Sequence, residues 1–144
     1  MDFQIIIQLI LAVILGSLIG IEREYKRKEA GMRTYSLVCL GAAFFTIISF
    51  ETFKMFINQS GINFDPTRMV GQIVLGIGFL GAGLIIFRDH HIEGLTTAAG
   101  LWVAAAVGAA IGAKFYFPAI FVSLLAIAIL AGLRLIEEKL FNKS

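Results

Sequence analysis

The Lys, Arg, Asp and Glu residues of this chain all lie outside five uncharged stretches of 17 to 20 residues. The stretches are residues 3–21, 34–50, 69–87, 94–113 and 115–133. A helix that crosses the hydrocarbon core of a bilayer needs about 20 mainly apolar residues. The pattern therefore predicts an all-α, polytopic membrane bundle with five transmembrane helices, in a single transmembrane domain over residues 1–144.

Composition agrees with this class and excludes others. Hydrophobic residues make up 58% of the chain and charged residues only 15%, whereas soluble domains carry about 25% charged residues. The uncharged stretches do not alternate between apolar and polar residues, so helices are expected rather than the strands of a barrel. The acidic start, Met1-Asp2, favours a retained first span over a cleaved signal.

Basic residues divide unequally between the two predicted sides of the membrane. Nine lie on the side that holds the loop after the first stretch: Arg23, Lys26, Arg27, Lys28, Arg33, Arg88, Arg134, Lys139 and Lys143. Three lie on the other side: Lys54, Arg68 and Lys114. Loops rich in Lys and Arg stay in the cytoplasm. The N-terminus is therefore predicted outside and the C-terminus in the cytoplasm, and the basic excess is assigned to topology rather than to nucleic-acid binding.

Glycines are spaced for helix contact in several of the stretches. Gly16 and Gly20 form a G-x-x-x-G pair, and the third stretch carries Gly76, Gly78, Gly81 and Gly83. Small residues let helix backbones approach closely in lipid, where packing drives association. We expect the first, third and fourth spans to pack tightly. Because so small a bundle leaves glycine faces uncovered, a homodimer is also expected.

Polar residues gather where the predicted spans meet the cytoplasm. They are Glu22, Arg23, Arg33, Thr34, Arg88, Asp89 and Thr97. One interpretation is a polar pocket that binds an ion, an anionic head group or a partner. The alternative is that these side chains only anchor helix ends and set topology. Arginine suits fixed, bidentate contacts with carboxylate or phosphate, which favours defined pairing.

Other motifs carry less chemistry. The G-x-G-x-x-G of residues 76–81 lies inside a span and lacks the preceding strand of a nucleotide site. His90-His91, with Asp89 and Glu93, could chelate a metal. Adjacent residues rarely face one site, so a solvated loop is expected instead. The residues that would bind a metal remain unknown. Trp102 is expected to be a packing residue. Asp65-Pro66 predicts an N-cap before the third span, and the second span is expected to continue as a short amphipathic helix.

No Asp, Glu, Lys, Arg or His residue lies in any of the five stretches. Proton and ion relays usually need such groups, and Mg²⁺ usually binds carboxylates. A magnesium pathway within one subunit is therefore poorly supported. No nucleophile–base pair is present either, so we expect a protein that is not an enzyme and has no cofactor.

Four blocks in order along the chain resemble the MgtC/SapB family of bacterial inner-membrane proteins. They are Gly16-Ser-Leu-Ile-Gly20-Ile-Glu22-Arg23, Ala30-Gly31-Met32-Arg33-Thr34, Gly76-Ile-Gly78-Phe-Leu-Gly81-Ala-Gly83, and Gly94-Leu-Thr-Thr97-Ala-Ala-Gly-Leu-Trp102. The resemblance implies a multi-pass protein of the bacterial inner membrane that is linked to magnesium homeostasis. It also implies restraint of a partner, the F-type ATP synthase, rather than movement of Mg²⁺. Many members carry a soluble domain after the last span, and no such C-terminal soluble domain is expected here.

Two functions follow as hypotheses. The first is a membrane-embedded regulatory or binding protein that acts through its glycine faces and its inner polar cluster. The alternative is a transporter or channel for Mg²⁺ or another cation, with its pathway between subunits.

Overall fold

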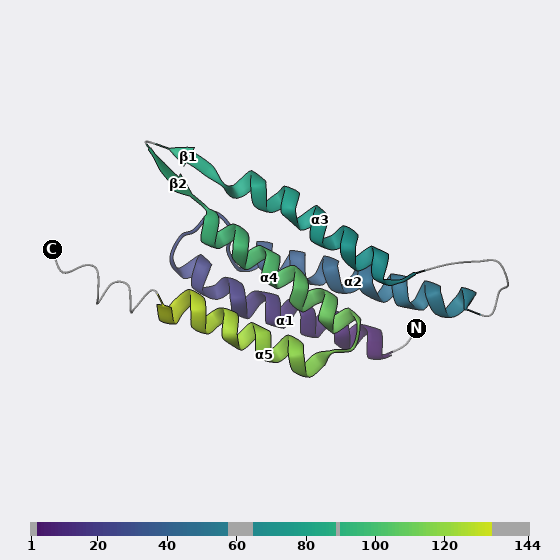
Figure 1. Cartoon of the computed structure of the whole chain (residues 1–144). Coiled ribbons are helices and arrows are strands. Elements are labelled where there is room, and N and C mark those ends of the chain that lie inside the picture. The colour runs from purple at the N-terminus through teal and green to yellow at the C-terminus, as the bar shows by residue number, and fades with distance from the viewer. Residues whose placement is uncertain (1–2, 58–64, 89, 134–144) are drawn as a thin grey trace.

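The chain forms a bundle of apolar helices in a computed structural model that describes residues 3–57, 65–88 and 90–133 (Figure 1). The helices are α1 (Phe3–Tyr25), α2 (Met32–Phe56), α3 (Thr67–Leu84), α4 (Leu95–Gly112) and α5 (Tyr116–Ile127), which continues as the π-helix η1 (Ala128–Leu133). Strands β1 (Ile86–Arg88) and β2 (His91–Glu93) lie between α3 and α4. Five segments of the described chain are long and apolar enough to cross a membrane, the last comprising Tyr116–Leu133. The predicted all-α class and number of spans are confirmed.

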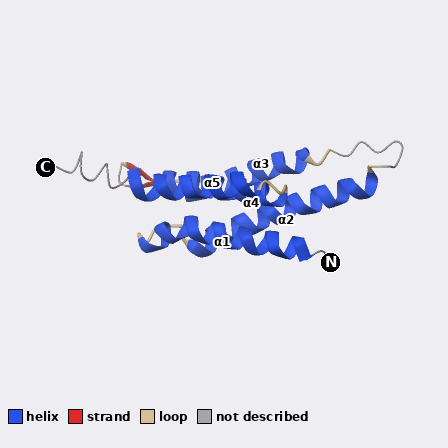
Figure 2. Ribbon diagram, turned by 90° about the horizontal axis from the view of Figure 1, so that it is seen from below, coloured by secondary structure: helices blue, strands red, loops and turns tan. Residues whose placement is uncertain are grey.

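The helices lie roughly side by side in two layers. Figure 2 shows α1 in one layer and α3, α4 and α5 in the other, with α2 beginning beside α1 and rising obliquely towards the second layer. Helix α4 has the largest buried share of the five spans, so it is the centre of the bundle. The core between the layers is formed by Ile19 of α1, Tyr35 and Cys39 of α2, and Leu101 and Ile111 of α4. This arrangement places the start of α4 beside the loop that joins α1 to α2.

Glycines make the closest helix contacts, but not all at the expected positions. A Cβ at Gly16 would lie 2.8 Å from the Cβ of Cys39, and a Cβ at Gly20 would lie 2.7 Å from the Cα of Met32. Gly108 and Gly112 of α4 also pack against α2. The closest glycine contacts therefore join α2 to α1 and to α4. The expected packing of the third span against the fourth is present, whereas its expected packing against the first is wrong.

The glycines of α3 differ from those of α1. A Cβ at Gly81 would make an ordinary 3.6 Å contact with Ala98, whereas a Cβ at Gly76, Gly78 or Gly83 would meet nothing within 4 Å. Only Ile77 and Gly81 of α3 are buried. Spacing alone cannot show which face of a helix meets a neighbour, and these three glycines face away from the contacts within this chain.

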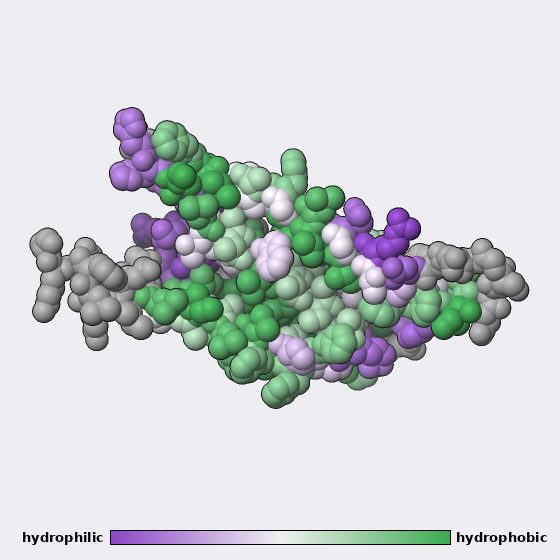
Figure 3. Space-filling model, in the orientation of Figure 1, coloured by the Kyte–Doolittle hydropathy of each residue, from purple (hydrophilic) through white to green (hydrophobic). Residues whose placement is uncertain are grey.

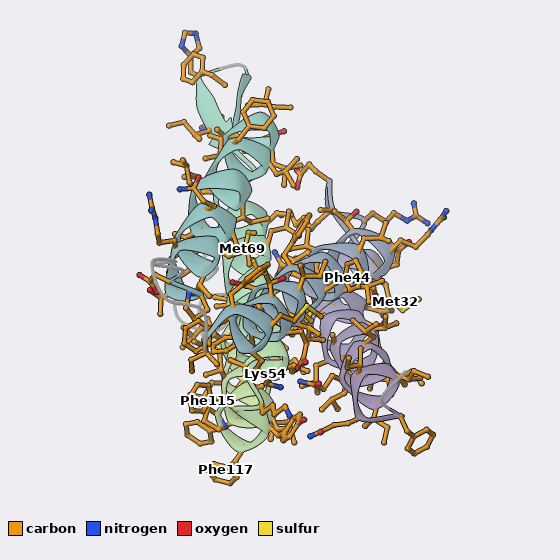
Figure 4. All side chains as sticks on the ribbon, turned by 90° about the vertical axis from the view of Figure 1, so that its right-hand side faces the viewer. Met32, Phe44, Lys54, Met69, Phe115 and Phe117 are labelled. Carbon is orange, nitrogen blue, oxygen red and sulfur yellow. The ribbon has the colours of Figure 1, made fainter. Side chains whose placement is uncertain are left out.

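Large apolar side chains cover the outside of the bundle. Figure 3 shows hydrophobic residues along the middle of the visible face and hydrophilic residues towards both ends. Phe117 of α5 is 81% exposed and points away from the bundle in the end-on view of Figure 4. Trp102 is 50% exposed rather than packed in the core. A soluble protein rarely exposes so large an apolar surface, whereas lipid chains would cover it in a bilayer.

Polar side chains inside the bundle are bonded to backbone carbonyls. The Nε2 atom of Gln8 donates to the carbonyl oxygens of Ile111 (2.7 Å) and Gly112 (3.2 Å). The hydroxyls of Thr46 and Ser123 donate to carbonyls one turn earlier in their own helices. Each of these groups satisfies a hydrogen-bonding need locally. Within the described residues they do not form a continuous file of polar groups from one end to the other.

The third span starts near the predicted cap but ends earlier than the sequence predicts. Asp65 accepts hydrogen bonds from the backbone N–H (2.9 Å) and hydroxyl (2.7 Å) of Thr67, in the manner of an N-cap. At the other end α3 stops at Leu84, before the end of the uncharged stretch at residue 87. Residues 86–88 pair antiparallel with residues 91–93 instead, so the loop expected around His90 and His91 is a short hairpin. Helix α2 continues past residue 50 to Phe56, as expected.

Candidate functional site

A cavity of about 700 Å³ lies at the end of the bundle where α1 and η1 end and α4 begins. We call it the end cavity. Cavities of this size commonly hold small molecules. Its walls come from the α1–α2 loop, β2, the first turn of α4 and η1. The lining residues are Arg23, Arg27, Lys28, Glu29, Ile92, Glu93, Gly94, Leu95, Thr96, Thr97, Ile129, Leu130 and Leu133.

The end of α1 brings basic residues to the cavity. The backbone N–H of Arg27 donates to the carbonyl of Glu24 (3.0 Å), and that of Lys28 donates to the carbonyl of Arg23 (3.0 Å). These two bonds form a Schellman motif, whose C′ residue is left-handed and is usually glycine. Arg27 occupies this position with φ 52°. The turn therefore reverses the chain and sets Arg27 and Lys28 on the cavity wall.

Arg23 is a buried cation at the base of this wall. It is 4% exposed, and its Nε and Nη2 atoms both contact Oε2 of Glu22. The other carboxylate oxygen of Glu22 is buried and has no hydrogen-bond partner among the described residues. Burying a charge is costly unless it is paired and hydrogen-bonded. The pair is therefore a strong local constraint with one unsatisfied acceptor.

Thr97 connects three elements at the start of α4. Its hydroxyl donates to Oε2 of Glu29 in the α1–α2 loop (3.1 Å). Its carbonyl accepts a hydrogen bond from the hydroxyl of Tyr35 in α2 (3.1 Å), and Tyr35 is fully buried. Gly100 leaves room for this ring, because a Cβ there would overlap the Tyr35 hydroxyl. The first turn of α4 is thereby fixed to α2 and to the α1–α2 loop.

The pKa of Glu29 is held below its ordinary value of 4.5 by a hydrogen bond from its own backbone. Burial is the second-largest influence and raises this pKa, whereas the Thr97 hydroxyl and the nearby Lys28 and Arg23 lower it. The carboxylate is therefore favoured in the folded state. An unfolded chain binds this proton at a higher pH, so Glu29 stabilises the fold above about pH 4.5 and loses that contribution as the pH falls through its lower folded pKa.

Replacing Thr97 with valine is expected to reduce this acid sensitivity. Valine has a shape similar to that of threonine but lacks the hydroxyl that donates a hydrogen bond to Glu29. We expect a loss of about 1 kcal/mol near neutral pH, which is typical of one hydrogen bond, and a smaller loss below pH 4. The measurement is the thermal unfolding midpoint in detergent between pH 3 and 7. Thr96→Val is the control, and equal pH profiles for Thr97→Val and the parent chain would contradict the assignment.

The structure brings together only part of the polar cluster expected from the sequence. Glu22, Arg23 and Thr97 lie at or beside the end cavity. Arg33 and Thr34 are exposed and do not line it. The side chain of Arg88 and the whole of Asp89 lie outside the described residues. The start of α2 lies near the end of α1, yet Arg33 and Thr34 do not reach the cavity. They lie on the exposed side of the first turn of α2.

Sequence reasoning missed several residues of this site. Arg27 and Lys28 were assigned only to topology, and Glu29 and Tyr35 were not singled out. A buried tyrosine at the first turn of a span is a weak signal of a polar contact, because its hydroxyl needs a partner. The contact between Glu29 and Thr97 joins residues 68 positions apart, and no local pattern indicates it.

The residues considered for metal binding do not gather. His91 and Glu93 belong to β2 and are exposed. No three His, Cys, Asp or Glu residues come together to hold a metal ion in the part of the chain that the structure describes.

Comparison with known proteins decides the family. The MgtC family matches residues 9–139. The chain belongs to the MgtC family. It is a multi-pass membrane protein, as its five apolar helices and its MgtC family membership together indicate. The resemblance read from the sequence blocks is thus confirmed. No solved structure matches the chain.

Relatives in the MgtC family differ in whether their names state an activity. The chain is 40% identical over its full length to "Putative magnesium transporter YhiD" of Escherichia coli K12, covering 67% of that protein. It is 41% identical to Protein SapB of Bacillus subtilis over 89% of this chain and 55% of the relative. It is 44% identical to Protein MgtC of Brucella abortus over 85% of this chain and 48% of the relative. The chain thus spans about half to two thirds of the length of these relatives.

Proposed function

We propose that this MgtC family protein is a membrane-embedded regulatory or binding protein of the bacterial inner membrane, linked to magnesium homeostasis. The end cavity is its interaction site and faces the cytoplasm, and the excess of basic residues on that side supports this orientation. The N-terminus lies outside. A second copy of the chain and another membrane protein, such as the F-type ATP synthase, are its proposed partners.

The observation that carries this proposal is the chemistry of the bundle interior. Gln8, Thr46 and Ser123 are buried there and bonded to backbone carbonyls. Among the described residues, the one charged side chain that is buried is Arg23, at one end, and it is paired with Glu22. A cation that crossed a single subunit would find no buried carboxylate among the described residues of the bundle core. Binding at the end cavity requires no such path.

A cation transporter with its pathway between subunits is the second candidate. Two observations favour it. The buried, unpartnered oxygen of Glu22 is a possible cation ligand. Gly76 and Gly41 also face an apolar groove of about 490 Å³ between α2 and α3, where a second helix could pack. The name of the Escherichia coli relative, "Putative magnesium transporter YhiD", agrees with this candidate.

A flux measurement separates the two candidates. The full chain is reconstituted in liposomes that contain a Mg²⁺-sensitive dye, and external Mg²⁺ is added. We expect no uptake above that of protein-free liposomes. Saturable uptake that is abolished by Glu22→Gln and kept by Glu51→Gln would overturn the regulatory proposal. Glu51 is a matched control because it pairs with Lys54 (2.6 Å), at the opposite end of α2 from the cavity.

A further inference from the structure

The walls of the end cavity carry opposite charges that do not pair with one another. Arg27 and Lys28 lie on the wall formed by the α1–α2 loop, and Glu93 lies on the β2 wall. In the described residues none of these three side chains has an ion-pair partner within 4.0 Å. The other two charged lining residues are engaged already, Arg23 with Glu22 and Glu29 with Thr97. Among the described residues the cavity therefore presents two cations, Arg27 and Lys28, and two carboxylates, Glu29 and Glu93, without ion-pair partners, and of the two carboxylates only Glu29 is hydrogen-bonded, to Thr97.

A third wall is apolar and leads onto the outer surface of α5. Leu130 of η1 is buried, whereas Ile129 and Leu133 are 55% and 53% exposed. Leu95, at the start of α4, is 54% exposed. These side chains continue the apolar surface of the membrane-spanning segment into the cavity. A ligand that fills all the walls must therefore have an anion, a cation and an apolar tail.

We propose that the end cavity binds an aminophospholipid, with the phosphate at Arg27 and Lys28, the ammonium group at Glu93 and an acyl chain along Ile129 and Leu133. Arginine and lysine between membrane helices bind lipid phosphates well. The carboxylate of Glu93 selects the head-group amine, because it can accept hydrogen bonds from an ammonium group. This inference goes beyond the proposed function and does not require that the protein regulates a partner.

Other ligands with the same phosphate chemistry fit fewer of the walls. Free phosphate would contact Arg27 and Lys28 but would leave the apolar wall without a partner. An anionic lipid such as phosphatidylglycerol would contact both of these walls, yet Glu93 would face a head group that carries no cation. A choline head group carries a cation without N–H donors, so it could not hydrogen-bond to the carboxylate.

Lipid binding to the full chain in detergent, followed by native mass spectrometry, tests the proposal. The probes are short-chain phosphatidylethanolamine, phosphatidylglycerol and phosphatidylcholine, together with inorganic phosphate. We expect phosphatidylethanolamine to bind most tightly. Arg27→Gln with Lys28→Gln should weaken binding of all three lipids, and for phosphatidylethanolamine by roughly 30-fold, if each cation contributes as juxtamembrane cations do. Glu93→Gln should remove the preference for phosphatidylethanolamine over phosphatidylglycerol.

Arg33→Gln is the matched control, because Arg33 is an exposed arginine near this end that does not line the cavity. We expect it to change lipid affinity less than about two-fold, as for a surface charge in salt. Equal losses with Arg33→Gln and with the double variant would overturn the proposal, since they indicate non-specific attraction. Inorganic phosphate that binds as tightly as the lipid would also overturn it, in favour of a soluble ligand. Neither result bears on the flux measurement.

Discussion

Gly108→Ala is expected to lower the stability of the bundle by about 1–3 kcal/mol, as overpacking in a closely packed interior does. A Cβ at this position would overlap the carbonyl oxygen of Cys39 and lie 2.9 Å from its carbonyl carbon. It would also lie 3.0 Å from the Cβ of Ala42. Because the obstructing atoms belong to the backbone of α2, the two helices must separate to admit the methyl group.

The measurement for Gly108→Ala is unfolding in detergent, followed by circular dichroism as the mole fraction of dodecyl sulfate rises. Gly76→Ala is the matched control, since a Cβ there meets nothing within 4 Å. Alanine is favoured over glycine inside a helix by about 0.5–1 kcal/mol, so this control should be neutral or slightly stabilised. Equal unfolding midpoints for the two variants would contradict the assigned contact between α2 and α4.

Arg23→Met is expected to cost about 3–5 kcal/mol, which is typical when one partner of a buried ion pair is removed. The side chains of Arg23 and Glu22 are only 5% and 12% exposed. Methionine would leave the Glu22 carboxylate buried without its cation. The same unfolding measurement applies, and Arg33→Met, at an exposed arginine, should change stability by less than about 0.5 kcal/mol.

A double variant separates the ion pair from simple packing. Glu22→Gln combined with Arg23→Met removes both charges, so it should recover much of the stability lost in Arg23→Met alone. If the losses of the two single variants simply add in the double variant, the two side chains are not coupled. That result would remove the ion pair as the reason for burying Arg23.

The helices could be predicted from the sequence because the bilayer permits few alternatives. A span must be apolar for about 20 residues and must satisfy its own backbone, and both requirements act locally. The exception is residues 85–87, where an apolar run leaves the helix and enters a hairpin. Apolar side chains suit both a membrane helix and a strand. Only the pairing of residues 86–88 with 91–93 shows that this segment is a strand.

The contacts between helices were less predictable than the helices themselves. A glycine pair such as Gly16 and Gly20 indicates that the backbone of another helix approaches closely, but it does not identify that helix. The end cavity depends on contacts such as that from Thr97 to Glu29, which only the folded chain brings together. Charged residues near helix ends also serve topology, so their sequence positions could not separate Arg23, which is buried, from Arg33, which is exposed.

Helix α3 buries only two of its residues, Ile77 and Gly81. In a bilayer, lipid chains rather than water would meet any surface of α3 that its neighbours do not cover. Helix α3 has the smallest buried share of the five spans and packs chiefly against α4, at the edge of the bundle. A shift of α3 would also move the hairpin that follows it, and with it Glu93 on the wall of the end cavity.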